Sequence, residues 1–364
     1  MYKIYKTKMS VCSFISNYIE NNKIKITKQK LKLLKGLYKL IEDGINREKK
    51  YTILKTEEIT PIKKTKFISM TNVEYINNNG LKEIGYKVND NTKNIIIKFI
   101  IFTKEEEEKI EEYLKKILSW LYICEHQSNN LCNNDILIYI YLTPLKKQLS
   151  RETNHNIGVH NVNSAYSTIC STPNEIIIYR KEEWFKVFVH ETLHAYIKPN
   201  RDISVSKKIK NILKIEMLED INVDEGYVES WGRIINSIYN GYETSRDMSE
   251  YLIKTMIYIE SEKYYSMMQM YKILEKNGID GKTLREYRET TNILSYYVLA
   301  GILMSDPYEF ISKNNMFEID ERNIYIQILN RNLNKMNNFI EKIGNIGEDI
   351  SLRMTLYENC VKID

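Results

Sequence analysis

Glycine and proline are scarce in this 364-residue sequence, with 13 and 5 residues respectively. Both residue types favour turns and interrupt helices, so their scarcity predicts a helix-rich protein rather than a loop-rich one. The few glycines form neither a GxxxxGK[ST] nor a GxGxxG pattern. The sequence therefore lacks the two common glycine-rich loops that bind phosphates.

Cysteine is also scarce. The five cysteines are an odd number with no CxxC spacing, and they stand at positions 12, 124, 132, 170 and 360. This pattern indicates neither a disulfide framework nor a thiolate zinc site, so we expect a reducing, cytoplasmic environment. We also expect no secretory signal, because the first residues contain no long apolar core and no small-residue cleavage site.

Long apolar runs are missing as well. The longest run, ILSYYVLAGILM at 293–304, is too short to span a bilayer, so we expect no membrane partner. Hydrophobic residues nevertheless make up 43% of the chain, which is enough to build a globular core and excludes the disordered class.

Positive charge is concentrated near the start of the chain. Residues 1–70 hold 17 Lys and Arg against 6 Asp and Glu, whereas the remainder holds 36 against 42. Such a basic segment could contact nucleic acid. We prefer a compositional explanation, because the whole chain is rich in Lys, Asn, Ile and Tyr and no nucleic-acid-binding module accompanies the charge.

The hydrophobic periodicity predicts an α+β protein. Strand-like patterns occur at 83–88, 94–102, 135–142, 159–169 and 175–180. Helical patterns occur at 27–47, 104–124, 182–197, 205–219, 221–239, 247–276 and 283–304, with further helices to the end. We expect residues 51–80 to be irregular, and we expect 159–169 and 175–180 to form a strand pair around the turn STPN.

The segment KVFVHETLHAYI at 186–197 contains an HExxH motif. On a helix, His190 and His194 lie one turn apart on the same face and can hold one ion, for which zinc is well suited. Glu191 lies beside that face and can act as general base on a water molecule. The alternative is two ordinary histidines on a core helix. The uncharged residues around the motif, with no proline, favour the metal site.

A third ligand is expected downstream. The metzincin pattern HExxHxxGxxH is excluded, because Ile197 replaces its glycine and Asn200 replaces its third histidine. The segment INVDEGYVESWGRII at 221–235 offers Glu225 and Glu229, which are four residues apart and share a helix face. They could instead belong to a solvated helix face. If one of them binds the metal, Glu225 is the preferred ligand, and Asp224 and Glu229 are the alternatives.

These motifs resemble those of gluzincin metallopeptidases, the thermolysin-like HExxH…E group, over about residues 157–240. The resemblance implies that Glu225 binds Zn²⁺ and that Glu229 supports a zinc histidine. It also implies a minigluzincin-like core: a small mixed sheet, the HExxH helix and the glutamate helix, with substrate aligned on an edge strand from 159–169 or 175–180. The implied activity is zinc-dependent hydrolysis of a peptide or protein substrate. No GxMEN-like motif is present, which favours an endopeptidase over an aminopeptidase.

One feature of thermolysin-type enzymes is missing, since no histidine follows His194 to stabilise the oxyanion. We therefore expect a tyrosine, an arginine or an upstream histidine in that role. Tyr296 and Tyr297 are the preferred candidates, because a helical C-terminal region often closes over such a cleft. Tyr227 and His160 are the others.

On this interpretation the chain divides into a basic, largely helical region (1–80), a metallopeptidase-like domain (81–245) and a helical C-terminal domain (246–364). The runs YLTPLKK, HNVNSAYST, EIIIYRKEEWFKVFVHETLHAY and EGYVESWGRIIN also resemble an uncharacterised family of large cytoplasmic DNA viruses, across most of 137–305. This resemblance would imply a location in the host cytoplasm or the virion. The rival hypothesis is a non-catalytic, zinc-containing interaction or structural protein. A closed four-ligand site would favour that rival, and an open cleft beside an edge strand would favour the enzyme.

Overall fold

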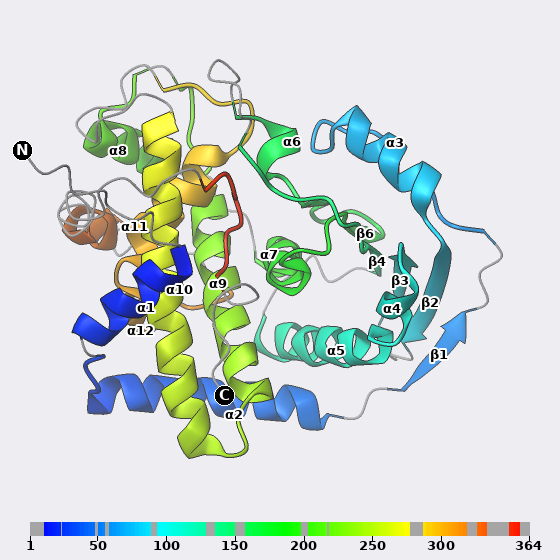
Figure 1. Cartoon of the computed structure of the whole chain (residues 1–364), viewed down its shortest axis with the longest axis horizontal. Helices are drawn as coiled ribbons and strands as arrows, with labels where there is room; N and C mark the ends of the chain where they lie inside the picture. The colour runs from blue at the N-terminus through cyan, green and yellow to red at the C-terminus, as the bar shows by residue number, and fades with distance from the viewer. Residues whose placement is uncertain are drawn as a thin grey trace, which may run out of the picture.

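The computed structural model describes most of the chain (Figure 1). The described residues are 11–22, 24–47, 50–54, 58–88, 93–128, 135–149, 157–197, 203–216, 218–276, 287–318, 326–332 and 349–356. They form an α+β structure in which one mixed sheet is combined with a larger number of helices. The predicted fold class is confirmed at this level.

The sheet has six strands in the order β1-β2-β3-β4-β6-β5. The strands are β1 (Tyr51–Leu54), β2 (Lys82–Val88), β3 (Ile95–Ile101), β4 (Ile136–Tyr141), β5 (Ala165–Ser167) and β6 (Asn174–Ile178). The three central strands β3, β4 and β6 are parallel, and the outer pairs are antiparallel. The short β5 is therefore an edge strand, next to β6.

The helices lie on both faces of the sheet and in a further layer (Figure 1). They are α1 (Val11–Asn22), α2 (Lys28–Asn46), α3 (Met70–Asn79), α4 (Lys104–Glu107), α5 (Ile110–Gln127), α6 (Val159–Val162), α7 (Trp184–Tyr196), α8 (Ile203–Leu213), α9 (Val223–Glu243), α10 (Met248–Lys276), the π-helix η1 (Leu294–Leu299), α11 (Ala300–Met304) and α12 (Pro307–Lys313).

Both faces of the central strands are buried, as the near-continuous isoleucine runs predict. Alternate residues such as Ile97 and Ile138 join the main core with α5 and α7. The intervening residues Ile100 and Ile177 pack in a second cluster with Val73 of α3. The sheet is thus enclosed between α5 and α7 on one side and α3 on the other.

The α9–α10 pair forms the layer behind α7, and Figure 1 shows the two helices side by side. They approach closely at Gly241, where an added Cβ would lie 2.0 Å from Oγ1 of Thr255. A side chain at this position would force the helices apart, so the glycine permits the packing. η1 and α11 lie against the same pair.

Several predicted boundaries are wrong. Residues 51–80 are not irregular, because they contain β1 and α3, and α3 begins after Ser69, whose hydroxyl accepts from Asn72 N. The predicted strand 159–169 begins as α6, and only 165–167 form β5. The strand pair around STPN is confirmed. Residues 287–293, within the predicted helix 283–304, precede η1, and 349–356 are extended rather than helical.

The division of the chain at residue 80 separates elements that pack together. β1 pairs with β2 along its whole length. α2 packs against both α5 and α10. The basic N-terminal region thus contributes to the same sheet and the same core as the residues that follow it.

The cysteines depart from expectation at one position. Cys170 is disulfide-bonded, whereas Cys124 is a buried free thiol. Cys132 and Cys360 lie outside the described residues. The expectation of no disulfide is therefore wrong for Cys170, because pairing depends on the distance between Cα atoms in the fold and not on spacing in the sequence.

The longest apolar run, 293–304, consists of η1, α11 and the residue before them, and it is buried except for the partly exposed Tyr296. Among the residues that the structure describes, no helix is both long enough and apolar enough to cross a bilayer.

Candidate metal centre

Helix α7 carries the HExxH motif through the middle of the molecule. Its apolar residues Phe188, Val189 and Leu193 have no exposed surface, and burying each contributes about 1.5–3 kcal/mol. Thr192, inside the motif, accepts a 2.7 Å hydrogen bond from Nε1 of Trp120 in α5. This contact helps to fix the rotation of α7, so that the opposite face, with both histidines, is turned toward α9.

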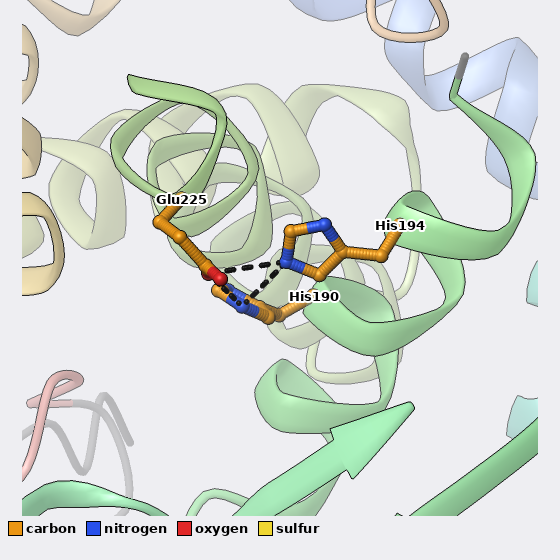
Figure 2. Close-up of side chains that lie close together, drawn as sticks. All are labelled: His190, His194 and Glu225. Atoms are coloured by element: carbon orange, nitrogen blue, oxygen red, sulfur yellow. Dashed lines mark hydrogen bonds and ion pairs between the residues drawn. The ribbon is translucent and has the colours of Figure 1, made fainter. Parts of the chain in front are cut away.

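Three side-chain atoms converge between α7 and α9 (Figure 2). Oε2 of Glu225 lies 3.1 Å from Nε2 of His190 and 3.1 Å from Nε2 of His194. The two Nε2 atoms are 3.2 Å apart. All three atoms are potential metal ligands, and they point toward one another from two helices.

This triangle has the dimensions of a zinc site. Two ligands at about 2.0–2.1 Å from a tetrahedral zinc ion lie about 3.3 Å apart. The observed separations of 3.1 and 3.2 Å are close to that value. Two imidazole nitrogens and one carboxylate oxygen are also the donor set of catalytic zinc sites with a free fourth position. The residues present therefore fit zinc.

The charges around the triangle favour a cation. Burial by itself would favour the neutral ring of His190, but Glu225 and Glu229 raise its pKa to about 9. Burial would raise the pKa of Glu225, but His194 and His190 hold it well below its usual value. Without a metal, a proton on a histidine ring can supply the positive charge. Metal ligation requires neutral histidine, so a divalent ion that binds here replaces that proton.

Glu225 uses its two oxygens differently. Oε2 faces the histidines, while Oε1 accepts a hydrogen bond from Nδ2 of Asn292 at 3.2 Å and a longer one from Asn222 at 3.5 Å. Asn292 precedes η1 and is more than sixty residues away in sequence, so no local pattern identifies it as part of the site.

Glu229 lies behind His190, one helical turn beyond Glu225. Its Oε2 lies 3.1 Å from Nδ1 of His190, although the ring N–H is poorly aligned with it. The carboxylate also accepts from Lys186 at 2.6 Å and from Arg233 at 2.8 Å. Burial opposes its charge, but these cations keep the pKa of Glu229 well below its usual value. It is thus a fully ionised carboxylate that contacts His190 from outside the triangle.

A cavity of about 430 Å³ opens beside the triangle. It is lined by Lys66, Phe67, Val159, Asn163, Ala165, Tyr166, Ser167, Ile169, His190, Glu191, His194, Ile197, Asn222, Asp224, Glu225, Val228, Thr290, Thr291, Asn292 and Tyr296. Glu191 accepts a 2.7 Å hydrogen bond from the hydroxyl of Ser167 in β5. This places the motif's glutamate between the edge strand and the histidines, inside the cavity wall.

The edge strand at this cavity comes from 159–169, not from 175–180, which forms the inner strand β6. Thr168 N bonds Glu175 O, and Tyr179 N bonds Ser164 O. In an antiparallel pair the hydrogen-bonded positions alternate, so the peptide groups of Ala165 and Ser167 point away from β6. Both residues line the cavity, and this edge is where an extended peptide could pair.

The structure brings only one of the candidate tyrosines to the site. The ring of Tyr296 lies 6.0 Å from the ring of His190 and lines the cavity. Burial and the carboxylates Glu225 and Glu191 raise the pKa of Tyr296 well above 10, so its hydroxyl keeps a proton that it can donate.

The other expected residues lie elsewhere or play no part in the triangle. The hydroxyl of Tyr297 donates to Leu352 O, and that of Tyr227 donates to Asn315 O and Glu318 O. His160 is not among the cavity-lining residues. Asp224 lines the cavity but lies outside the ligand triangle. Residues 296 and 297 are consecutive in η1, and consecutive side chains of a helix point in different directions, which is why at most one of them faces the triangle.

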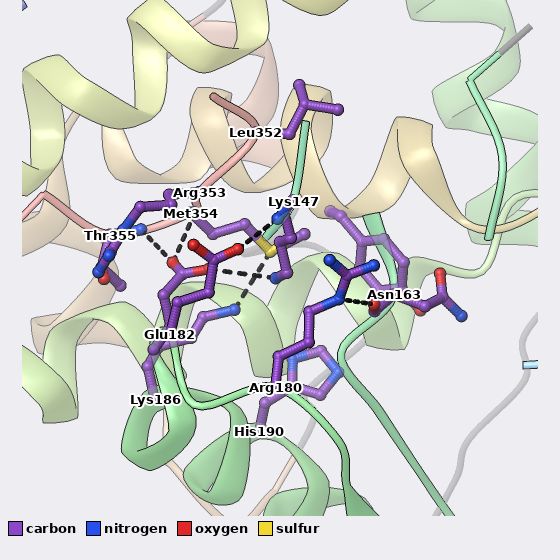
Figure 3. A network of polar contacts seen from close by, with 12 residues as sticks. Lys147, Asn163, Arg180, Glu182, Lys186, His190, Leu352, Arg353, Met354 and Thr355 are labelled. Atoms are coloured by element: carbon purple, nitrogen blue, oxygen red, sulfur yellow. Dashed lines mark hydrogen bonds and ion pairs between the residues drawn. The ribbon is translucent and has the colours of Figure 1, made fainter. Parts of the chain in front are cut away.

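A buried ionic network lies behind the triangle, and sequence reasoning missed it (Figure 3). Lys147 pairs with Glu183 at 3.2 Å, and Lys186 pairs with Glu229 at 2.6 Å. Glu183 precedes α7 with a left-handed φ of 61°, and its carboxylate accepts from the backbone N–H groups of Met354 and Thr355. The C-terminal segment is thus tied to the start of the HExxH helix.

No protein-family model matches this chain, and no curated protein or solved structure matches it either. The resemblances to gluzincin metallopeptidases and to a viral protein family therefore stay predictions.

Proposed function

We propose that this protein is a zinc-dependent peptidase built on a minigluzincin-like core of the sheet, α7 and α9. The observation that supports this most directly is the 3.1–3.2 Å triangle of His190 Nε2, His194 Nε2 and Glu225 Oε2, with Glu191 in the adjoining cavity. Three protein ligands beside an open cavity match a catalytic site better than a closed structural one.

When bound, zinc would supply a Lewis acid for a carbonyl group and would lower the pKa of a water molecule. Glu191 would act as the general base, accepting a proton from the attacking water and returning it to the leaving nitrogen of the peptide bond. Its hydrogen bond from Ser167 holds the carboxylate in place and keeps it off the ligand triangle. The hydroxyl of Tyr296, which lines the cavity, is our candidate donor for the developing oxyanion.

The substrate is an extended peptide bound along β5. The backbone N–H and C=O groups of Ala165 and Ser167, which point away from β6, can hydrogen-bond its main chain, which would hold a carbonyl near Glu191. The absence of a GxMEN-like motif favours cleavage within a chain over removal of terminal residues.

The first experiment is to measure zinc per chain in the wild type and in four variants: His190→Ala, Glu225→Gln, Glu229→Gln and Glu191→Gln. The proposal expects one zinc in the wild type, loss of zinc in His190→Ala and Glu225→Gln, and retention in Glu191→Gln. Retention separates the general base from the ligands. Hydrolysis of a peptide library should then be present in the wild type and absent in Glu191→Gln.

Folded wild-type protein that takes up no zinc would refute the metal centre. Zinc binding without hydrolysis of any peptide, in a protein whose Glu191→Gln variant behaves identically, would instead support the non-catalytic interaction protein. Circular dichroism of every variant is the control that distinguishes loss of a ligand from loss of the fold.

A further inference from the structure

The two oxygens of Glu225 are held by different parts of the chain. Oε2 lies in the ligand triangle with the histidines of α7. Oε1 is turned the other way and accepts from Nδ2 of Asn292 at 3.2 Å. Asn222, at 3.5 Å, is a weaker second donor to the same oxygen. The carboxylate is therefore presented to the triangle by one oxygen only.

Asn292 is well placed to hold this orientation, because the residues on either side of it are fixed. Its carbonyl accepts from Tyr296 N at 3.0 Å, which joins it to the start of η1. The neighbouring Thr291 donates from its hydroxyl to Asn163 Oδ1 at 3.2 Å. Leu294 N donates to the carboxylate of Glu289 at 2.6 Å, which caps the same turn. A π-helix is rare and often marks a functional position.

The number of bound oxygens matters for a catalytic metal. A glutamate that binds through both oxygens fills an extra coordination position, which a reacting water and a substrate carbonyl would need. A hydrogen bond to one oxygen makes that oxygen a poorer ligand and resists rotation of the carboxylate. Partners of this kind outside the coordination sphere typically change metal affinity about 10- to 100-fold.

We infer that Asn292 is a positioning residue that keeps Glu225 a one-oxygen ligand and so preserves an open coordination position. This inference rests on the proposed function, since it concerns the same metal centre. It also assigns the segment before η1 a direct role in the site, although the segment lies outside the part of the sequence that resembles gluzincins.

The test compares Asn292→Leu and Asn292→Ala with the wild type and with Thr290→Ala. Leucine keeps the branching of asparagine at Cγ but has no donor. Alanine removes the side chain beyond Cβ, so an effect shared by both variants does not come from the larger volume of leucine. Thr290 lies in the same segment and lines the same cavity, but the structure shows no hydrogen bond from it to Glu225. Each protein is titrated with zinc against a chelator, and each is loaded with Co²⁺ for its visible spectrum.

Both Asn292 variants should bind zinc about 10- to 100-fold more weakly than the wild type, and Thr290→Ala should not. Their cobalt spectra should be weaker than the wild-type spectrum, because five-coordinate Co²⁺ absorbs less than four-coordinate Co²⁺. The thermal stability of the metal-free proteins is also measured. If the role of Asn292 were only structural, its variants would be less stable than the wild type and their cobalt spectra would be unchanged.

Wild-type zinc affinity and a wild-type cobalt spectrum in both Asn292 variants would overturn the inference and leave the proposed metal centre intact. Absence of metal binding in the wild type would instead remove the proposed function, and this inference with it.

Discussion

Replacing Glu229 by glutamine tests the support of the proposed metal centre without changing a proposed ligand. The carboxylate is 1% exposed, and it receives Lys186 at 2.6 Å and Arg233 at 2.8 Å. Glutamine has the same shape but no charge. The substitution therefore leaves two buried cations without their anion, and His190 without the carboxylate behind its ring.

The expected cost to folding follows from that burial. Removing one partner of a buried ion pair typically costs about 3–5 kcal/mol, because the remaining charge is uncompensated. At about 1.3 °C per kcal/mol for a chain of this size, the melting temperature of the metal-free protein should fall by about 4–7 °C. Zinc affinity should fall separately, by about 10- to 100-fold, through the looser hold on His190.

Glu250→Gln is the matched control. Glu250 also meets two cations, Arg246 and Lys254, each at 3.0 Å and four residues away, but Arg246 is 91% exposed. Surface pairs of this kind contribute little to stability, so this variant should unfold almost as the wild type does. Denaturant unfolding of the metal-free proteins and chelator-competition titration measure the two effects. A Glu229→Gln variant that stays within 1 kcal/mol of Glu250→Gln would refute the argument from burial.

Three further predictions follow from other parts of the structure. Tyr296→Phe should keep its zinc and lower kcat by about 10²–10³-fold, as loss of an oxyanion donor does. Metal analysis and steady-state kinetics measure these effects, and an unchanged kcat would contradict the prediction. Burial raises the pKa of Glu289 from 4.5 to about 7, so its contribution to stability is full below pH 4.5 and is lost as pH rises to about 7. Between these pH values the free energy of unfolding of the wild type should decline by up to about 1.4 kcal/mol per pH unit, and Glu289→Gln should remove this decline. Identical pH profiles for the wild type and the variant would contradict the prediction. Gly241→Ala should destabilise by about 1–3 kcal/mol, because the added methyl meets Thr255, whereas Gly36→Ala in the open part of α2 should stabilise by about 0.5–1 kcal/mol; equal melting temperatures would refute this contrast.

The proximity of His190 and His194 was determined by the sequence itself. Residues four apart on a helix share a face whatever surrounds the helix, and the apolar residues around the motif indicated that this helix would be buried. The α+β class followed in the same way from the isoleucine runs and the long amphipathic segments. The sequence pattern did not predict β1 and α3 within 51–80, or the non-helical backbone of 349–356. Contacts with distant residues stabilise these segments, and such contacts are not visible in a local pattern.

Only the tertiary structure decided which acidic side chain meets the histidines. Glu225 and Glu229 lie on one face of α9, and the point where α9 crosses α7 selects between them. An added Cβ on Gly232 would lie 3.4 Å from Lys186 O and 3.7 Å from His190 Cβ, so the two helices approach closely there. That crossing places Glu225 in the triangle and Glu229 behind it.

Tertiary packing also decides that Tyr296, and not Tyr297, lies at the site. It also brings Asn292 there, although Asn292 belongs to no motif. These residues reach the site from a region about one hundred residues beyond the HExxH helix, through the packing of η1 against α9. Local spacing determines what one helix can present, because helix geometry is fixed by the backbone. The completion of a site by several helices depends on how their buried faces pack, and that packing is a property of the whole fold.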